Sequence, residues 1–399
     1  MLEKLSREDV WNSFFDYRAG LAGGSAGLEE LRSFIDSAGY LRVYQEITEG
    51  RDFPLPSKSV ISKSSSEKKR TVYSYPPEEN MVMKLLTYLV LRRYDGLFSP
   101  ALYSFRPGRC AKDAVRRLIS DPAVKNMYSY KADISNYFNS VDISLLLPEL
   151  EAALEDDREL YEFLSRLLRE PCVMDRGKRI YEKKGIMAGT PISSFYANLF
   201  LRGLDEYFCE KGIKYIRYSD DIIVFGNSEE DTEEYAGYIR EYLSGRGLSV
   251  NPQKEVFSSP EEGWSFLGFS YRRGTVDISS VTVKKIKAKM RRKSRALLRW
   301  RERNNISGEK AAAAFIRIFR RKLLESPKDN ELSWSFWFFS VINTADSLRE
   351  IDRYAVDCIR YIITGTRRKS RFRVGYEDIK KLGFVSLVNS YYGDKLNRE

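Results

Sequence analysis

Two adjacent aspartates stand between two apolar runs in residues 214–227, KYIRYSDDIIVFGN. The runs Tyr215–Tyr218 and Ile222–Phe225 favour β-strands, so the segment predicts a β-hairpin with Asp220 and Asp221 at its tip. Carboxylates held side by side repel each other unless a cation or solvent neutralises them. Mg²⁺ suits such a pair because it takes hard oxygen ligands and shares them with substrate phosphates. A solvated turn without chemistry is the alternative.

A third aspartate, Asp133, lies in the run SYKADISNYFNSV at residues 129–141, which predicts a short strand made otherwise of mostly apolar or small residues. A carboxylate in such a strand needs a partner. A metal site shared with Asp220 would supply one, and a salt bridge is the alternative.

The composition of the chain limits the chemistry that it can perform. The 399 residues contain no histidine, which excludes His-based triads, His-ligated zinc and histidine general bases. The 4 cysteines are scattered singly, which favours a reducing cytoplasm and argues against zinc. No apolar run is long enough to span a membrane, and the first residues lack the apolar core of a secretory signal, so we expect a cytoplasmic location. The net charge of +11 favours a polyanionic partner.

A basic segment at residues 58–75 precedes the acidic residues and predicts a hairpin. Lys63, Lys68, Lys69 and Arg70 surround a Ser-rich bend, which would give the hairpin a cationic tip. Such a tip can clamp a triphosphate, because guanidinium groups grip phosphate oxygens with a fork of donors. A solvated basic loop is the alternative.

Two further segments could approach nucleic acid. In residues 103–118, Arg106 and Arg109 flank a Pro-Gly pair that bends the backbone sharply. This turn could hold a template backbone or form a surface ion-pair loop. Residues 185–205 combine a Gly-rich entry with a predicted long amphipathic helix, which would let the backbone approach a base or primer strand. A plain junction between loop and helix is the alternative.

The tail of the chain is strongly basic. Between Lys284 and Lys322 there are sixteen Lys and Arg residues against two acids, Glu302 and Glu309, with aromatic residues interleaved. This pattern predicts a pair of basic helices that follow phosphates. A helix lying on an anionic membrane surface is the alternative.

Taken in order, these segments resemble the fingers-and-palm core of reverse transcriptases over about residues 60–272. The resemblance implies an α+β right-hand polymerase, in which an antiparallel sheet flanked by helices forms fingers and palm and α-helices form the thumb. It divides the chain into an N-terminal helical extension (1–57), fingers (58–130), a palm (131–272, with a fingers insertion at about 142–184) and a basic α-helical thumb or C-terminal domain (273–399).

The resemblance also implies the chemistry, which is RNA-directed DNA synthesis by two-metal-ion nucleotidyl transfer. Asp133, Asp220 and Asp221 match the aspartates that hold two Mg²⁺ ions, for which Mn²⁺ is a substitute, with the Ile134 carbonyl as a further ligand. One ion activates the primer 3′-hydroxyl and the other shields the triphosphate and the leaving pyrophosphate. Lys254 matches a lysine that protonates this pyrophosphate.

Further residues match the family's contacts with its substrates. Phe138, preceded by Tyr137, matches an aromatic gate that collides with a 2′-hydroxyl, so deoxynucleotides should be preferred. The residues implied in dNTP binding are Arg70, Lys63, Lys69, Phe138, Tyr137 and Gly189. Those implied in nucleic-acid binding are Arg106, Arg109, Lys284, Lys285, Arg291, Arg292, Lys293 and Arg295.

One departure concerns the loop before the palm helix. Its usual Pro-Gln-Gly falls at Met187, Ala188 and Gly189, so a polar contact near the templating base is lost. The Tyr-Ser-Phe-Arg turn, the Ala-Gly-x-Pro loop and the terminal Leu-Gly-Phe-x-Ser-Leu-Val-x-x-Tyr-Tyr resemble bacterial defence-associated and abortive-infection reverse transcriptases, which are related to group II intron and retron enzymes. That branch implies antiphage DNA synthesis on a partner non-coding RNA.

Other functions fit the same residues. A retron or group II intron-type reverse transcriptase of a mobile element is one, and a template-independent DNA polymerase is another. A non-catalytic RNA-binding scaffold is the alternative outside enzymology, although retained acids at all three positions argue against it. The expected partners are an RNA template, the DNA product and dNTPs, with a homo-oligomer as a further expectation and no membrane.

Overall fold

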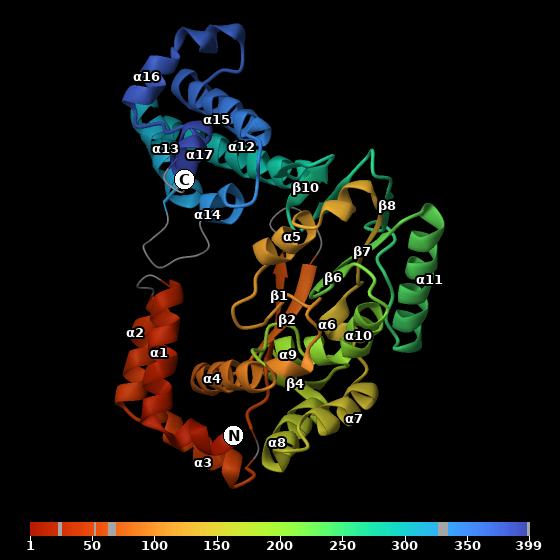
Figure 1. Cartoon of the computed structure of the whole chain (residues 1–399). Helices are drawn as coiled ribbons and strands as arrows, with labels where there is room; N and C mark the ends of the chain where they lie inside the picture. The colour runs from red at the N-terminus through yellow and green to blue at the C-terminus, as the bar shows by residue number, and fades with distance from the viewer. Residues whose placement is uncertain (23–25, 52, 63–68, 326–333, 397–399) are drawn as a thin grey trace. The chain divides into compact units, whose positions relative to one another are not determined.

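The computed structural model divides the chain into two compact units, Met1–Pro260 and Glu261–Glu399 (Figure 1). It describes residues 1–22, 26–51, 53–62, 69–325 and 334–396. The sequence places the end of the palm after residue 272, whereas the two units divide after Pro260. The difference arises because the aromatic hairpin at 264–272 joins a small sheet of the second unit.

The N-terminal part is helical, as predicted. A short 3₁₀ helix, Leu2–Ser6, precedes α1 (Glu8–Ala22), α2 (Ala26–Asp36) and α3 (Gly39–Thr48). Trp11 is fully buried and stacks on Tyr40 with 5.2 Å between ring centroids. Helix α4 (Pro77–Arg93) begins at a proline, whose fixed φ angle suits the first helical position. These helices share a core with the first unit's strands and α9.

A sheet of the first unit has the strand order β2-β1-β4-β5. Its strands are β1 (Ser57–Ser62), β2 (Lys69–Ser74), β4 (Cys172–Asp175) and β5 (Lys178–Tyr181). The antiparallel β1–β2 pair confirms the hairpin predicted at 58–75. Residues 63–68, including Lys63 at its expected tip, lie outside the described residues.

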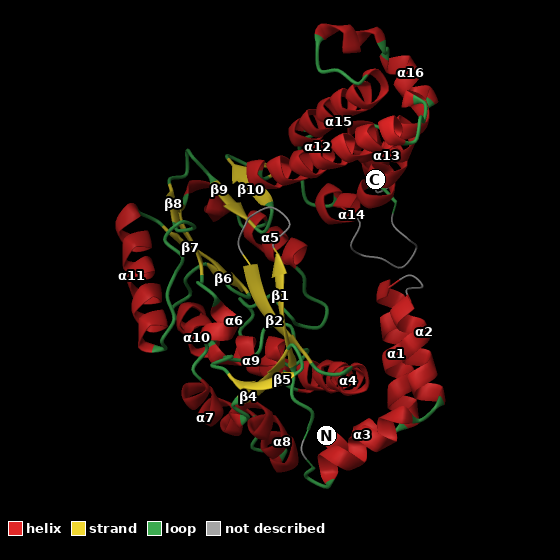
Figure 2. Cartoon of the chain, turned by 180° about the vertical axis from the view of Figure 1, so that it is seen from behind, coloured by secondary structure: helices red, strands yellow, loops and turns green. Residues whose placement is uncertain are grey.

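A second sheet carries the acidic residues. Its order is β6-β7-β3-β8, and every neighbouring pair is antiparallel. The strands are β3 (Tyr128–Asp133), β6 (Tyr215–Tyr218), β7 (Asp221–Gly226) and β8 (Val256–Ser258). Helix α11 (Glu229–Gly245) packs against β3 and β7. Both views show it near β7 (Figures 1 and 2).

The other helices of the first unit surround these sheets. They are α5 (Ala111–Ile119), α6 (Tyr137–Ser140), α7 (Ile143–Ala153), α8 (Arg158–Arg169), α9 (Ser193–Phe200) and α10 (Arg202–Glu210), with 3₁₀ turns at Asp95–Leu97 and Pro122–Asn126. The long helix expected before residue 205 is therefore two helices, which meet at Leu201.

The second unit combines a small sheet with a helical bundle. The sheet has the order β11-β10-β9, formed by β9 (Trp264–Phe266), β10 (Phe269–Arg272) and β11 (Thr275–Ile278). The helices are α12 (Ser280–Arg303), α13 (Gly308–Leu323), α14 (Trp334–Phe339), α15 (Asp346–Thr364), the 3₁₀ helix Lys369–Arg373, α16 (Tyr376–Lys381) and α17 (Leu387–Leu396). The predicted pair of basic helices corresponds to α12 and α13.

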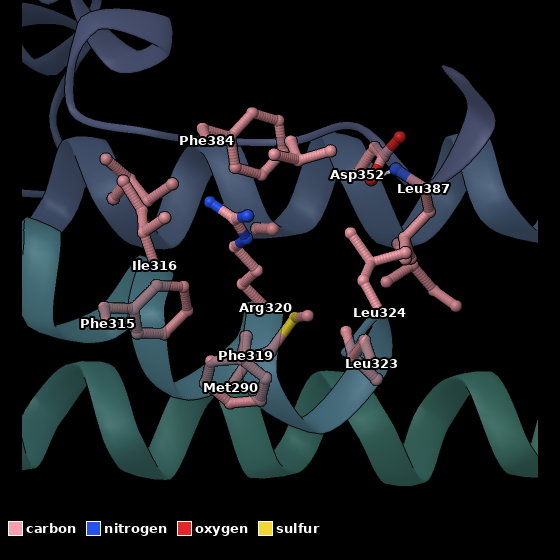
Figure 3. A pocket seen from close by; sticks show the side chains of 14 residues that line it. Met290, Phe315, Ile316, Phe319, Arg320, Leu323, Leu324, Asp352, Phe384 and Leu387 are labelled. Atoms are coloured by element: carbon pink, nitrogen blue, oxygen red, sulfur yellow. Dashed lines mark hydrogen bonds between the residues drawn. The ribbon is translucent and has the colours of Figure 1, made fainter. Parts of the chain in front are cut away.

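Helices α12, α13 and α15 pack together around a small apolar cavity (Figure 3). Met290 and Phe319 line it from α12 and α13, and Phe384 closes the side on which Arg320 extends. The cavity measures about 30 Å³, which leaves room for very few water molecules between apolar walls. We interpret it as a packing gap in the core of this unit. Within the described ranges, no helix is both long and apolar enough to cross a membrane.

Candidate active site

The three predicted aspartates meet at one end of the second sheet. Strands β6 and β7 pair through Tyr218 and Asp221, which leaves Ser219 and Asp220 as the turn between them. Asp133, the last residue of β3, pairs directly with Asp221. Opposite residues of antiparallel strands point to the same face of a sheet, so these two carboxylates share one side. The predicted meeting of these residues is therefore confirmed.

A backbone hydrogen bond ties the turn to the third aspartate. The N–H group of Ile134 donates to the carbonyl oxygen of Asp220 at 3.0 Å. Ile134 itself is buried, with 1% of its surface exposed. The position of Asp220 relative to Asp133 is thus fixed by main chain rather than by flexible side chains.

The cluster concentrates negative charge in a partly buried place. Burial, and then repulsion from Asp220 and Asp133, raise the pKa of Asp221 to about 6. The pKa of Asp220 is raised by burial and by the charge of Asp133. Lys254 and, for Asp221, Lys131 partly offset these effects. A bound cation would therefore stabilise the site by reducing the repulsion between these carboxylates.

Lys254 contacts the aspartate cluster through Asp133. Its ammonium group forms an ion pair with the Oδ2 atom of Asp133. Backbone bonds hold this lysine in place, because the Lys254 N–H donates to the Asn251 carbonyl at 2.8 Å and the Asn251 N–H donates to the Asp133 carbonyl at 2.7 Å. The lysine is thus bound to the end of β3 by both its side chain and its main chain.

The donor atoms fit Mg²⁺, but the side chains do not form a closed ligand set. Among the described residues, no three Asp, Glu, Cys or His side chains converge in an arrangement that could hold a metal ion. Asp133 forms an ion pair with the ammonium group of Lys254. Carboxylate oxygens are nevertheless the donors that Mg²⁺ prefers, and their mutual repulsion is what such an ion would relieve.

A buried ion pair that the sequence analysis missed supports the acidic turn. Arg217 and Asp205 are both 0% exposed, and the guanidinium binds the carboxylate through two hydrogen bonds of 2.7 and 2.5 Å. Arg217 also donates to the carbonyl oxygens of Ser219 at 3.3 Å and Asn198 at 3.2 Å. The sequence contains one indication of this ion pair, which is an arginine inside the apolar strand YIRY. A buried charge requires a partner.

Ser104 fixes the other side of the same turn. Its hydroxyl oxygen accepts the Ser219 N–H at 2.8 Å, and its carbonyl oxygen accepts the side-chain amide of Asn198 at 2.9 Å. The Tyr103 N–H donates to the Arg217 carbonyl at 3.1 Å. Ser219 has a left-handed φ of 60°, a strained conformation for a serine, which these contacts stabilise.

The structure corrects the role predicted for Arg106. This side chain does not reach outward for nucleic acid, since its residue is 8% exposed and its guanidinium binds both carboxylate oxygens of Asp95 at 2.7 and 2.9 Å. It also donates to the Ser99 carbonyl at 2.7 Å. Arg109 is half-buried and donates to the Pro100 carbonyl at 2.8 Å. Both arginines hold the turn at 103–109 in shape by donating to backbone carbonyl oxygens.

Phe138 and Tyr137 differ in accessibility. Phe138 is half-buried and packs edge-on against the exposed ring of Phe105, with 6.3 Å between centroids. Tyr137 is 2% exposed and its hydroxyl donates to the Ala197 carbonyl at 2.5 Å. The predicted contact of Tyr137 with a nucleotide is therefore corrected, because its side chain points into the core.

The loop at 185–189 packs tightly against β2. A Cβ atom on Gly189 would lie 2.9 Å from the Tyr73 carbonyl oxygen, and its φ is +104°, so glycine is required there by backbone packing. The Tyr73 N–H donates to the Ala188 carbonyl at 2.8 Å. Met187 and Ala188, which stand where the family has Pro-Gln, are both buried. The backbone of this loop is therefore packed against the hairpin that carries the basic residues.

The basic residues predicted to hold phosphates are exposed where the structure describes them. Lys69 and Arg70 lie exposed on β2, and the next residue, Thr71, accepts a hydrogen bond from the Asn139 side chain at 3.4 Å. Strand β2 thus adjoins the helix that carries Phe138.

In the second unit, Lys284, Lys285, Arg291, Arg292 and Arg295 are exposed on α12 and Lys293 is half-buried. Among the described residues, none of these six forms an ion pair, whereas Lys287 pairs with Glu350.

The sequence is similar to a known family and to several known proteins. Residues 61–271 match the family model described as "Reverse transcriptase (RNA-dependent DNA polymerase)". The retron Ec83 reverse transcriptase of Escherichia coli is 31% identical over 144 residues, which cover 34% of this chain and 44% of that protein. An uncharacterized 91 kDa protein in the cob intron of Schizosaccharomyces pombe is 23% identical over 273 residues, covering 53% of this chain and 34% of that protein. The chain thus spans less than half the length of these relatives.

A solved structure of apo telomerase from Candida tropicalis, truncated from its C-terminal domain, is similar with a TM-score of 0.45 and 12% identity. It covers 56% of this chain and 55% of the telomerase chain. The family model extends over more than half of the sequence and includes Asp133, Asp220, Asp221 and Lys254. The α+β fold with antiparallel sheets and a helical C-terminal region is as expected, and the chain belongs to the reverse transcriptase (RNA-dependent DNA polymerase) family.

Proposed function

We propose that this chain is an RNA-directed DNA polymerase that extends a primer with deoxynucleotides by two-metal-ion nucleotidyl transfer. The observation that carries the proposal is the pairing of Asp133 with Asp221, beside Asp220, inside the region that matches the family model. Because the chain has no histidine, carboxylates and lysine are the groups available for metal binding and proton transfer.

The three aspartates would hold two Mg²⁺ ions, with the carbonyl of Ile134 as a further ligand. When bound, the ions would lower the pKa of the primer 3′-hydroxyl and neutralise charge on the triphosphate and the leaving pyrophosphate. A metal ion bound to Asp133 would replace the ion pair between Asp133 and Lys254. The ammonium group of Lys254, released in this way, would donate a proton to the departing pyrophosphate.

Residues beside the cluster would position the nucleotide. Arg70 and Lys69, exposed on β2, would grip the triphosphate, because guanidinium and ammonium groups bind phosphate oxygens. Phe138 would lie beneath the sugar, where its ring excludes a 2′-hydroxyl. Its edge-on contact with Phe105 supports this role, since a gate has to be held in one orientation.

The nucleic acid would be held in part by the unpaired cations of α12, which suit a phosphate backbone. We further propose that this DNA synthesis serves antiphage defence, with a structured non-coding RNA as template partner. Its support is the resemblance of the turn at 103–109 and of the terminal Leu-Gly-Phe-x-Ser-Leu-Val motif to defence-associated enzymes.

A retron-type reverse transcriptase is the second candidate function. It is favoured by the similarity to the retron Ec83 enzyme, which is 31% identical over the matched 144 residues. Sequencing the nucleic acid that copurifies with the protein would discriminate the two. A structured RNA encoded beside the gene, recovered joined to its own DNA copy, would favour a retron, whereas a structured RNA recovered with a separate DNA copy would favour the defence assignment.

The catalytic proposal is tested by DNA synthesis on a primed RNA template with Mg²⁺ or Mn²⁺. We expect incorporation of dNTPs by the wild-type protein and a loss of about a thousandfold or more in the Asp220→Ala/Asp221→Ala double variant. Glu233→Ala, which removes an exposed acid of α11, is the matched control and should retain activity. Synthesis that persists in the double variant would refute the assignment of the metal ligands.

A further inference from the structure

A polar cavity of about 410 Å³ lies in the first unit, among residues to which the proposed polymerase mechanism gives no role. Its walls come from the segment before β1, from the residue after β2, from α8 and its last turn, and from β5 with Lys184 in the loop that follows it. Arg166, Arg179 and Lys184 line it, together with one acid, Glu170. Basic side chains thus outnumber acids three to one.

Lys184 is the unusual member of this cavity. It is 4% exposed, and its ammonium group donates only a long hydrogen bond of 3.4 Å to the Cys172 carbonyl. Among the described residues, no carboxylate forms an ion pair with it. Burial lowers the pKa of Lys184, and the nearby charge of Glu170 offsets this effect only in part. A bound anion would supply the missing compensation.

Arg166 and Arg179 complete the basic lining of the cavity. Arg166 donates to the Gly50 carbonyl at 3.2 Å and, within the described residues, forms no ion pair. Arg179 is 64% exposed and lies 3.6 Å from Glu170, whose carboxylate also accepts the Cys172 N–H at 2.9 Å. Glu170 therefore binds a backbone N–H as well as Arg179, and among the described residues Arg166 and Lys184 form no ion pair with an acid.

Apolar and aromatic residues also line the cavity. Phe53 and Tyr75 are among them and contact each other edge-on, with 5.2 Å between centroids. Cations and aromatic rings in one cavity suit a ligand with a charged phosphate part and a flat part. The volume of about 410 Å³ lies in the range of small-molecule sites.

We propose that this cavity binds a phosphate group, carried either by a free nucleotide or by the 5′ end of a nucleic acid, with Lys184 at the base of the site and Arg166 and Arg179 at its mouth. The site is separate from the aspartate cluster, and its occupation does not require a divalent metal. Charged hydrogen bonds to phosphate provide the affinity, and Phe53 and Tyr75 contribute when a base is present.

The test is calorimetric titration of the full chain in EDTA, so that metal-dependent binding at the aspartates does not contribute. The probes are ATP, inorganic tripolyphosphate and a 5′-phosphorylated ribo-oligonucleotide. We expect saturable binding of at least one probe, weakened at least about tenfold by Lys184→Met. Lys183→Met, which removes the exposed neighbouring charge, should leave the affinity unchanged.

The pattern among the probes identifies the source of the phosphate. If ATP and tripolyphosphate bind with equal affinity, the phosphate groups alone provide the affinity. If ATP binds more tightly, its base also contacts Phe53 and Tyr75. Binding of only the oligonucleotide assigns a nucleic-acid end. Arg166→Gln/Arg179→Gln alters exposed side chains and serves as a second variant should Lys184→Met disturb folding. Absence of saturable binding by all three probes, or binding unchanged in both variants, would overturn the proposal.

Discussion

The guanidinium of Arg217 binds the carboxylate of Asp205 through two hydrogen bonds, and both residues are fully buried beside the turn that carries Asp220 and Asp221. The same guanidinium donates to the carbonyl oxygen of Ser219. One ion pair therefore links helix α10 to the acidic turn. It explains why a charged residue occupies the centre of a strand that is otherwise apolar.

The ion pair predicts a large loss of stability when its acid is removed. Asp205→Ala leaves the charge of Arg217 buried without a partner, so the free energy of unfolding should fall by about 3–5 kcal/mol, measured by urea denaturation. Glu206→Ala is the control, since Glu206 pairs with Arg202 on the surface and should cost less than about 1 kcal/mol. Equal losses in the two variants would contradict the special role of the buried pair.

The raised pKa of Asp221 predicts a stability that depends on pH when no metal is present. Its pKa is about 6 in the folded chain against an ordinary 3.8. The folded state thus binds the proton more tightly, and the stabilisation that this gives is present below pH 3.8 and lost as the pH rises through about 6. Above pH 6, the free energy of unfolding of Asp221→Asn, measured by urea denaturation, should therefore exceed that of the wild type by at most about 3 kcal/mol. This difference should vanish near pH 4.

Mg²⁺ provides the control for this titration. Because a cation would neutralise Asp221 in the wild type, adding Mg²⁺ should reduce the advantage of Asp221→Asn above pH 6. A difference between the variants that stays constant from pH 4 to pH 8 would show that repulsion in the cluster is not the cause.

Phe138 predicts the choice of sugar. Phe138→Ala should lower the preference for dNTPs over NTPs, measured as the ratio of kcat/KM values, on the order of tenfold or more, because the ring would no longer exclude a 2′-hydroxyl. Tyr137→Phe removes only the buried hydrogen bond to Ala197 and should leave that ratio unchanged. If both variants discriminate sugars like the wild type, Phe138 is not the gate.

The unpaired cations of α12 predict how RNA binding responds to salt. Replacing Lys284, Lys285, Arg291 and Arg292 by Gln should weaken RNA binding and reduce the slope of log K against log salt by up to about 3, since each phosphate contact to single-stranded RNA contributes about 0.7. Lys287→Gln should change the slope less, because Lys287 is already paired with Glu350. An unaltered slope in the quadruple variant would place the RNA elsewhere.

Much of the site could be read from the sequence because the signals were local. Two apolar runs that flank the Asp-Asp pair predicted the hairpin, and the structure has β6 and β7 there. A lone acid in a strand predicted a partner for Asp133, which the structure gives as Lys254 in the same cluster. The basic hairpin at 58–75 followed from its turn residues in the same way.

Other residues were misjudged because a charge or a ring looks the same in sequence whether it points inward or outward. Arg106 seemed available to nucleic acid, yet Asp95 and buried carbonyls take up its donors. Tyr137 seemed a neighbour of the nucleotide, yet it faces the core. Which side a residue faces depends on packing between segments distant in the chain.

The amino-acid sequence by itself determined the chemical options of this protein, namely carboxylates at three positions, no histidine and an excess of positive charge. It also determined the local strands and turns, because these depend on neighbouring residues. Only the tertiary structure decided that β3 pairs with β7, which places Asp133 opposite Asp221, and that Arg217 finds Asp205. Strand register and the partners of buried charges result from contacts between distant segments, and composition and spacing do not encode these contacts one by one.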